Sequence, residues 1–272
     1  MHIVDSLLLA IVASTPLLLA VEGEVLVQRS GIINLGIEGM MLTAAMTSVM
    51  IGSFAGGIIG AVTMAALFGI FTVALRADQI VTGTAINLLA LGMTGFIYRE
   101  MQERFTRPIS RSGIDAIAIL AWIVVPVILA FLLWKTKFGL RLRASGENPE
   151  AVRSAGYSVA LQRWSALGIE AVLVGLGGAH LALVLSNGFA ENMTAGRGFI
   201  ALSIVIFGRW KIKGALLGTA VFGIAAAAQY ALQASGRGLP FHLLLAIPYV
   251  VTLLILCGIT GRVRAPEALG RG

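Results

Sequence analysis

Long apolar runs recur along almost the whole chain, and short polar segments separate them. A helix needs about 20 predominantly apolar residues to cross the hydrocarbon core of a bilayer. The first and seventh runs are short, so we expect each to be a partial or re-entrant element. The pattern predicts an all-α, polytopic bundle of transmembrane helices with about eight or nine crossings, some of them short or broken. The candidate spans are residues 6–21, 34–52, 56–75, 82–98, 114–134, 164–186, 197–208, 214–233 and 241–260.

The composition places the chain in a bilayer rather than in water. Its residues are 58% hydrophobic and only 12% charged, whereas about 25% of the residues of an ordinary soluble domain are charged. The 33 glycines agree with this assignment, because glycine is more frequent in membrane helices than in soluble ones. No linker or shift in composition divides the chain, so we expect a single transmembrane domain over residues 1–272.

The basic residues fall mainly on one side of this predicted bundle. With nine spans and the N-terminus outside, the loops of one side carry most of the 20 Lys and Arg residues, and such loops stay in the cytoplasm. The long basic loop 135–163 and the tail RVRAPEALGRG, expected to be loose, are therefore assigned to the cytoplasm, and loop 99–113 to the outside. The net charge of +7 is thus a topology signal, and a nucleic-acid partner is not expected.

Several motifs of catalysis are missing from the sequence. It contains no G-x-x-x-x-G-K-[ST] phosphate loop, so we expect no nucleotide to bind to this chain in that way. The three histidines, His2, His180 and His242, lack the spacing of metal ligands. No H-E-x-x-H or G-x-S-x-G motif occurs either. We therefore expect no catalytic residue, no metal site and no cofactor in this chain.

A polar segment in the middle of the chain, GLRLRASGENPEAVRSAGYS, carries the signals of a short helix. Asn148 can cap its N-terminus, and Pro149 suits the first helical position, where a missing N–H costs nothing. Glu150 then lies near the positive end of the helix dipole, and Gly156 can supply a left-handed stop. A helix of about two turns is marginal by itself in water. It is either an ordinary capped helix in a loop or a docking element for a cytoplasmic partner.

Two further stretches place polar side chains within predicted spans. In SGIINLGIEGMML, Asn34 and Glu38 are four residues apart and would share one helix face, while the glycines permit a broken helix. A carboxylate at this depth suggests a pathway, or Glu38 lies near the interface and pairs with Arg29 or a neighbouring helix. In TGTAINLLALG, Thr84 and Asn87 either line a polar path or hold neighbouring helices together.

Two more features of the spans remain. We interpret Glu170 and His180, in the sixth span, as partners in structural pairs rather than as ligands. The stretch ENMTAGRGFIALSIVIFGRW is polar and broken by glycine before a short apolar run. Interrupted helices at membrane depth are tolerated where they line a cavity or are buried in protein. This stretch is therefore a second candidate for a broken helix.

Five segments together resemble the membrane permease subunits of ABC importers, in the group that carries branched-chain amino acids, simple sugars and nucleosides. These segments are GIINLGIEGMML, TGTAINLLALG, GLRLRASGENPEAVRSAGYS, MTAGRGFIALSIVIFGRW and LLLAIPYVVTLL. The resemblance runs from about residue 22 to residue 260, with the motifs in the same order. The form NLGIEGMM looks most like the nucleoside type, which is served by lipoproteins of the basic-membrane-protein class.

The resemblance implies a subunit of a larger machine in the inner membrane of a prokaryotic cell. A second, related permease chain would complete a heterodimer, cytoplasmic ATPase subunits would hold ATP and Mg²⁺, and an external binding protein or lipoprotein would deliver a nucleoside, expected to be a purine nucleoside. The residues of the substrate pathway would be Asn34, Glu38, Thr84 and Asn87. The residues of a coupling helix that docks on the ATPase would be Gly146, Glu147, Asn148, Pro149, Glu150, Ala151, Arg153 and Gly156.

Three alternatives stay open at this point. The same machinery could carry a simple sugar such as ribose or a branched-chain amino acid, because the polar groups of the pathway do not select among these solutes. A stand-alone, ion-coupled secondary transporter would need paired intramembrane carboxylates, for which Glu38 and Glu170 have no diagnostic spacing. A membrane enzyme is disfavoured by the missing nucleophile and metal motifs.

Overall fold

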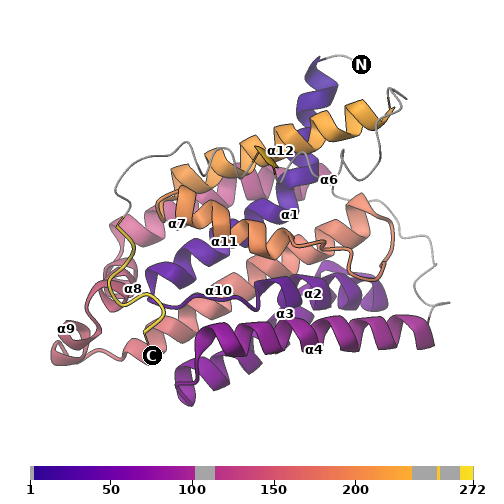
Figure 1. The fold of residues 1–272 in the computed structure, drawn as a ribbon. Helices are drawn as coiled ribbons and strands as arrows, with labels where there is room; N and C mark the ends of the chain where they lie inside the picture. The colour runs from indigo at the N-terminus through magenta and orange to yellow at the C-terminus, as the bar shows by residue number, and fades with distance from the viewer. Residues whose placement is uncertain (1–2, 102–113, 235–249, 252–263, 272) are drawn as a thin grey trace.

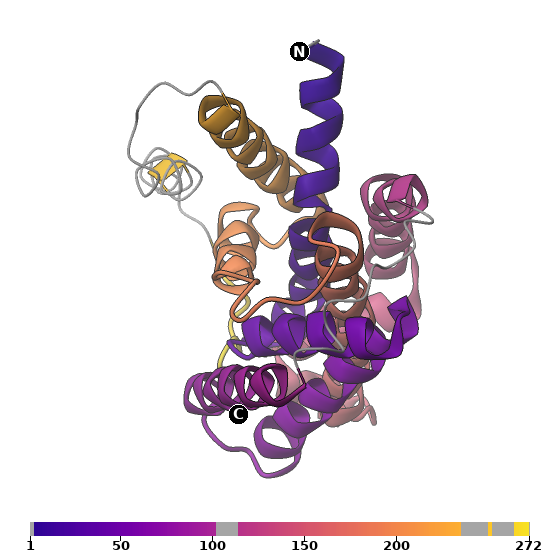
Figure 2. The same ribbon diagram turned by 90° about the vertical axis from the view of Figure 1, so that its right-hand side faces the viewer.

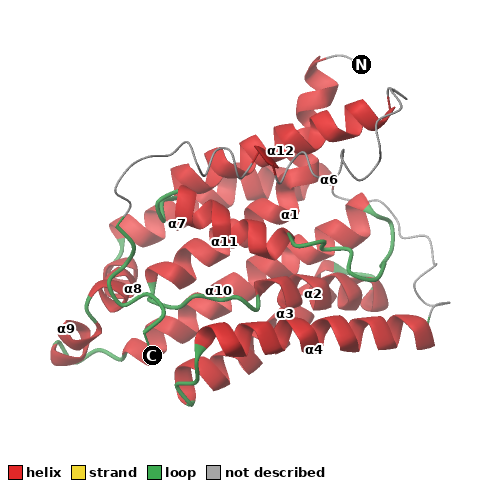
Figure 3. Ribbon diagram, in the orientation of Figure 1, coloured by secondary structure: helices red, strands yellow, loops and turns green. Residues whose placement is uncertain are grey.

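The computed structural model describes residues 3–101, 114–234, 250–251 and 264–271. Within these ranges every regular element is a helix (Figure 3), as the apolar runs predict. Figure 2 shows the bundle from the end at which α4 stops, with several helices seen nearly end-on. The helices are α1 (Ile3–Arg29), α2 (Ile37–Ile51), α3 (Phe54–Gly69), α4 (Gln79–Glu100), α6 (Ile114–Ile119), α7 (Val125–Lys135), α8 (Lys137–Glu147), α9 (Pro149–Ser154), α10 (Val159–His180), α11 (Arg197–Phe207) and α12 (Ile212–Ala234), with π-helical turns η1 (Ile70–Ala74), η2 (Leu120–Val124) and η3 (Leu181–Leu185).

Six of the described helices are long and apolar enough to cross a membrane, and two shorter apolar helices accompany them. The six are Ala10–Arg29, Phe54–Ala74, Gln79–Glu100, Ala116–Lys135, Val159–Leu185 and Ile212–Gln229. The chain is therefore a multi-pass helical membrane protein. The predicted span 241–260 and most of the predicted external loop 99–113 lie outside the described residues.

Helix α1 is the buried centre of the bundle and packs against α10, α12 and α11. The prediction of a short first span was wrong, because the helix continues through Glu22 and Glu24 to Arg29. The apolar run ends in the sequence at Glu22, which is why the predicted span was short. In the structure Glu22 and Glu24 are buried in protein, so the helix continues past them. Gln28 donates to Glu24 Oε1 over 2.8 Å and accepts from the indole of Trp210 over 2.6 Å. Buried polar groups are tolerated where such partners exist.

Helix α10 contacts α1, α2 and α3, and glycines let the backbones approach closely. A Cβ atom added to Gly57 of α3 would lie 2.5 Å from the carbonyl oxygen of Gly175 in α10. A Cβ atom on Gly178 would lie 2.5 Å from the carbonyl oxygen of Met41 in α2. Small residues at helix crossings replace, by van der Waals contact, the hydrophobic driving force that lipid does not provide. The glycine content is thus used for packing the bundle.

The two short apolar helices, α2 and α11, are half-helices that begin inside the bundle. The 15 residues of α2 and the 11 residues of α11 correspond to roughly 22 Å and 16 Å at 1.5 Å per residue, short of the roughly 30 Å of hydrocarbon. Non-helical segments precede both, residues 30–36 before α2 and residues 186–196 before α11. The run 197–208 therefore does not cross as a helix by itself, and both glycine-broken stretches are broken as expected.

Helices α8 and α9 gather at one end of the bundle with the C-terminal tail, on the left of Figure 1. We call this end, which also holds Arg29 and the turn at Trp210, the basic end. The expectation of a loose tail was wrong for the described part, residues 264–271. Ala268 N–H donates to the Gly146 carbonyl over 2.9 Å, and Gly270 N–H donates to the Gly31 carbonyl over 3.1 Å. Ala268 is also buried, so the tail is part of the packed structure.

Candidate functional site

The segment that precedes α2 is tied to α1 and α10 by the fully buried Asn34. Its amide nitrogen donates to Glu170 Oε2 over 2.7 Å, and its amide oxygen accepts from Gly36 N–H over 3.0 Å. Its backbone N–H points to Glu24 Oε1 at 3.3 Å. Because α2 begins only at Ile37, the prediction that Asn34 and Glu38 share a helix face was wrong. The structure places Asn34 outside the lining of the pocket described below.

Glu38, in the first turn of α2, accepts three hydrogen bonds from the turn that precedes α11 and from the first turn of α11. The hydroxyl of Thr194 donates to Oε1 over 2.5 Å, Gly196 N–H donates to Oε1 over 2.8 Å, and Gly198 N–H donates to Oε2 over 2.6 Å. Two of these donors flank the start of α11, where a carboxylate is favoured by unsatisfied N–H groups and by the helix dipole. Glu38 therefore joins the N-terminal ends of α2 and α11, and the alternative of a pair with Arg29 is not what the structure shows.

Asn87 of α4 holds the start of α2 from the opposite side. Its amide oxygen accepts from Gly39 N–H over 2.8 Å, and its amide nitrogen donates to the Leu35 carbonyl over 2.7 Å. Thr84, one turn earlier, is exposed and donates to the Ile80 carbonyl over 2.8 Å within its own helix. Asn87 therefore joins two helices, as one alternative predicted, and it also lines a pocket, so the alternative of a polar path stays a prediction.

That pocket has a volume of about 350 Å³ and lies where the two half-helices meet α4. Ligand pockets commonly measure about 300–1,000 Å³ and combine apolar walls with a few polar groups. Glu38, Thr84 and Asn87 lie in its wall, and Asn34 does not. Its lining residues are Glu38, Gly39, Leu42, Thr84, Asn87, Leu88, Leu91, Asn192, Gly196 and Phe199.

A second hollow of about 480 Å³ adjoins the pocket toward the C-terminal end of α4. Leu91 and Asn192 line both spaces, so the two are adjacent. At the far side Arg99 makes two hydrogen bonds to Glu191, over 2.8 Å and 3.1 Å. These bonds favour the charged form and lower the pKa of the Glu191 carboxyl. The hollow gives the pocket a route toward the end of the bundle opposite α9.

Sequence reasoning missed Asn192, Thr194 and Phe199. The stretch ENMTAGRG was recognisable as a broken helix, but nothing in its spacing indicates which side chains meet Glu38. The interaction of Thr194 with Glu38 joins residues 156 positions apart. The one sequence signal was the asparagine at position 192, because asparagine tolerates a left-handed backbone better than most residues, and the structure gives Asn192 a φ of 54°.

Glu24 of α1 and Glu170 and His180 of α10 are fully buried. Glu24 and Glu170 share one hydrogen-bonding partner, Asn34. Asn34 donates to both residues, with its side chain to Glu170 and its backbone to Glu24. Among the described residues His180 has no hydrogen-bond partner. The structure thus agrees with a structural pairing for Glu170 but shows none for His180.

The polar segment at the basic end folds as its cap signals predict. The side chain of Asn148 accepts from Ala151 N–H over 3.1 Å, Pro149 is the first residue of α9, and Gly156 has a φ of 79°. Helix α9 projects from the left end of the bundle in Figure 1. Among the predicted coupling residues Glu150, Ala151, Arg153 and Gly156 are exposed, and Val152 anchors the helix from its buried side.

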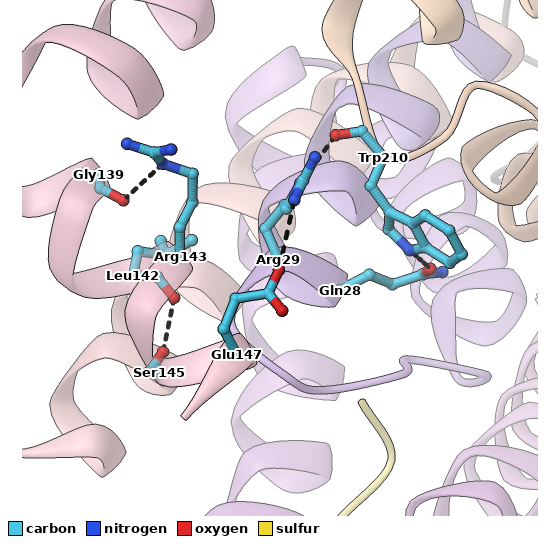
Figure 4. A network of polar contacts seen from close by, with 8 residues as sticks. All are labelled: Gln28, Arg29, Gly139, Leu142, Arg143, Ser145, Glu147 and Trp210. Atoms are coloured by element: carbon cyan, nitrogen blue, oxygen red, sulfur yellow. Dashed lines mark hydrogen bonds and ion pairs between the residues drawn. The ribbon is translucent and has the colours of Figure 1, made fainter. Parts of the chain in front are cut away.

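The other predicted coupling residues, Gly146 and Glu147, belong to the end of α8, which lies directly against the end of α1. Glu147 forms an ion pair with Arg29 at 3.8 Å, and Arg29 also donates to the Trp210 carbonyl over 2.9 Å (Figure 4). Gly146 is buried, and a Cβ atom there would collide with the Arg29 carbonyl. The hydroxyl of Ser145 donates to the Ser30 carbonyl over 3.2 Å. The α8–α9 unit is therefore bonded to the segment 30–36, which leads to the pocket.

No group of three or more His, Cys, Asp or Glu side chains suited to a metal ion occurs in the part of the chain that the structure describes. The side chains of Glu38, Thr84 and Asn87 in the pocket are engaged with backbone groups and with the hydroxyl of Thr194. The arrangement can shape and move a passage for a polar solute. It contains no nucleophile and base pair that would suggest a reaction.

Comparison with known proteins assigns the chain to a family. The family described as branched-chain amino acid transport system / permease component matches residues 6–258. The nucleoside ABC transporter permease protein NupC of Lactococcus lactis subsp. cremoris is 34% identical over 99% of this chain and 98% of its own length. The guanosine ABC transporter permease protein NupQ of Bacillus subtilis is 34% identical over 96% of this chain and 93% of its own length.

A second guanosine ABC transporter permease of Bacillus subtilis, NupP, is 23% identical over 77% of this chain and 69% of its own length. Two different permeases of Bacillus subtilis are therefore similar to this chain, one at 34% and the other at 23% identity. No solved structure matches it significantly.

Proposed function

The chain belongs to the family of branched-chain amino acid transport system permease components, and from this premise we propose that it carries nucleosides, in particular purine nucleosides, across the membrane. It is the permease subunit of an ATP-driven ABC importer and thus a transport subunit rather than an enzyme. The observation that carries the choice of substrate is the nearly full-length similarity to permeases named for nucleosides and for guanosine. Relatives named for a sugar or for branched-chain amino acids are less similar or are covered less completely.

The geometry supports this function at the pocket. Two half-helices meet there with their N-terminal ends, and transporters commonly bind their substrates where helices are discontinuous near the middle of the membrane. We propose that Glu38, Thr84 and Asn87 line the pathway and that Asn34 positions the wall behind them. Glu38 and Asn87 hold the start of α2 from two sides, so a movement of the segment 30–36 would change the shape of the pocket.

We propose further that α9 is the coupling helix and docks on a cytoplasmic ATPase subunit. Its exposed residues and rigid caps suit it to docking, and α8 connects it to the segment 30–36. ATP binding and hydrolysis, with Mg²⁺, would take place on that partner, and this chain would hold no cofactor. Movement of α9 would then open the pocket alternately to each side of the membrane.

The remaining partners are proposed from the same premise. A second, related permease would complete a heterodimer, and the two distinct Bacillus relatives support a pair of unequal chains. An external binding protein or lipoprotein would deliver the substrate to the end of the bundle near Arg99 and Glu191. The basic end, with loop 135–163 and the tail, would face the cytoplasm of a prokaryotic cell, because Lys and Arg are retained on that side.

Substrate titration of the binding protein that serves this importer tests the choice of nucleosides. We expect it to bind guanosine tightly and ribose and leucine weakly or not at all. Tight binding of ribose or leucine without any binding of nucleosides would show that the substrate assignment is wrong.

A second experiment tests the dependence on an ATPase. We expect the ATPase subunit to co-purify with this chain, and Ala151→Trp in the exposed face of α9 to abolish this association. Ala160→Trp, at an exposed position on the next helix, is the matched control and should keep it. Uptake into vesicles that contain this chain as the only protein would contradict the importer mechanism and favour a secondary transporter.

A further inference from the structure

The polar side chains that the sequence singles out are already engaged in hydrogen bonds that hold the pocket together. Both oxygens of Glu38 already accept bonds from Thr194, Gly196 and Gly198. Both ends of the Asn87 amide are bonded to the backbone. These groups therefore help to build the pocket, which directs attention to the residues of its wall that make no such bonds.

Two other residues of the wall remain exposed. Phe199, in the first turn of α11, is 47% exposed. Among the apolar side chains that line the pocket, only Leu88 is more exposed. Asn192 is exposed as well, and its side-chain amide has no hydrogen bond to the described residues. It lines both the pocket and the outer hollow, so a solute that moves between the two spaces passes it.

The position of both residues is determined by Glu38. Its bonds to Thr194 and Gly196 hold the turn that carries Asn192, and its bond to Gly198 holds the residue next to Phe199. Asn192 has a left-handed backbone and belongs to the turn formed by residues 191–196. An aromatic ring and an amide thus line one pocket on supports held by Glu38, together with the apolar residues Leu88 and Leu91 of α4.

We propose that Phe199 and Asn192 recognise the base of the nucleoside, with the base stacked on the Phe199 ring and its polar edge bonded to the Asn192 amide. This inference rests on the proposed function. Every base has a flat π-face that stacks on aromatic side chains. An amide, with a donor group and an acceptor, can pair with the donors and acceptors of a base edge. A free sugar or an aliphatic amino acid would use neither property fully.

The test uses the complete transporter, with both permeases, the ATPase and the binding protein, in proteoliposomes. Phe199→Leu keeps an apolar side chain but removes the ring, so we expect the kcat/KM of nucleoside uptake to fall at least about fivefold. Phe199→Tyr keeps the ring and should retain uptake. Phe131→Leu changes an exposed phenylalanine outside the pocket and serves as the matched control.

Asn192→Asp provides the second measurement, at an exposed position where the fold does not depend on the amide. An ionised aspartate only accepts hydrogen bonds, and the Watson–Crick edge of guanine presents two donors where that of adenine presents one. We expect the ratio of guanosine to adenosine uptake to rise in this variant.

The outcomes separate this inference from the function on which it rests. If the wild-type complex imports ribose or leucine and no nucleoside, the proposed function is wrong. If it imports nucleosides while Phe199→Leu behaves like Phe131→Leu and Asn192→Asp leaves the guanosine to adenosine ratio unchanged, only the role of these two residues is wrong. Should Phe199→Leu fail to assemble, the ratio measured with Asn192→Asp decides by itself.

Discussion

The carboxylate of Glu38 lies where the N-terminal ends of two half-helices meet, and it is only 8% exposed. A charged group at membrane depth is costly unless other groups replace its hydration. Here Thr194, Gly196 and Gly198 provide three donors, two of them from the backbone at the start of α11. The start of α11 therefore stabilises the Glu38 carboxylate, and the carboxylate in turn holds the start of α11 against α2.

Glu38→Gln tests this arrangement with nearly the same volume. The amide has one acceptor oxygen and a donor nitrogen, so at least one of the three donors loses its acceptor. A hydrogen bond to a charged group contributes about 1.5–3 kcal/mol, and we expect a lower midpoint of thermal unfolding of the purified complex together with reduced uptake. Glu267→Gln, which changes an exposed ion pair with Arg264, should leave both values unchanged. An unchanged midpoint in Glu38→Gln would contradict the structural role.

Asn34 occupies the opposite situation, as a neutral donor beside two carboxyl groups. Asn34→Asp replaces the nitrogen that donates to Glu170 with an acceptor and adds a third carboxyl group to a fully buried site. Because an unpaired buried charge is strongly destabilising, we expect poor assembly and a lower yield of the complex. The matched control is Asn148→Asp, where only the side-chain acceptor is used and an aspartate caps equally well. Equal yields of the two variants would contradict this account.

At the scale of elements, the connection between α8 and the end of α1 depends on the absence of a side chain at Gly146. A Cβ atom at this position would lie 2.9 Å from the Arg29 carbonyl carbon and 3.1 Å from the Gly31 nitrogen, both backbone atoms. These atoms cannot move aside without a displacement of the segment 30–36. The contact is thus close enough to transmit a movement of α9 toward the pocket.

Gly146→Ala is therefore expected to reduce the coupling of ATP hydrolysis to transport. The number of nucleosides imported per ATP should fall, while the ATPase still co-purifies because α9 itself is unchanged. Gly168→Ala of α10, where an added Cβ atom meets nothing within 4 Å, is the control and should be neutral or slightly stabilising. A variant at Gly146 with normal stoichiometry would exclude this route of transmission.

At the scale of the whole molecule, α9 lies at the basic end of the bundle (Figure 1), and the hollow that adjoins the pocket lies at the C-terminal end of α4. The tail 264–271 strengthens the basic end, since it bonds to Gly146 and Gly31 and since Arg163 donates to the Arg271 carbonyl over 2.9 Å. The tail therefore joins α10 to the same segment that α8 contacts. Truncation before this tail would remove contacts with three parts of the chain.

The proposed orientation can be measured with single cysteines in a Cys257→Ser background, because the sequence contains one cysteine. A membrane-impermeant maleimide added to intact cells should label Glu191→Cys and should not label Ser154→Cys until the membrane is permeabilised. Both positions are exposed, so the difference reports the side of the membrane. The reverse pattern would show that the basic end faces outward.

Local features of the sequence determined the elements. Hydropathy indicated the apolar helices, and the caps at Asn148, Pro149 and Gly156 defined α9, because both properties depend on residues within a few turns of one another. The same reasoning failed for α1, since a hydropathy pattern does not distinguish a polar residue in a loop from one buried in protein. It failed for the described tail for a related reason, because its partners Gly31, Gly146 and Arg163 are distant in the sequence.

The sequence by itself determined that this chain is a multi-pass helical membrane protein with two broken helices and one capped helix in a basic segment. Only the tertiary structure decided which polar groups meet. Glu38 meets Thr194 across 156 positions and Asn34 meets Glu170 across 136, whereas Asn34 and Glu38, four residues apart, lie in separate environments. The physical reason is that a buried polar group takes the partner that the packing of helices brings within about 3 Å, and sequence spacing across a break in a helix does not specify that partner.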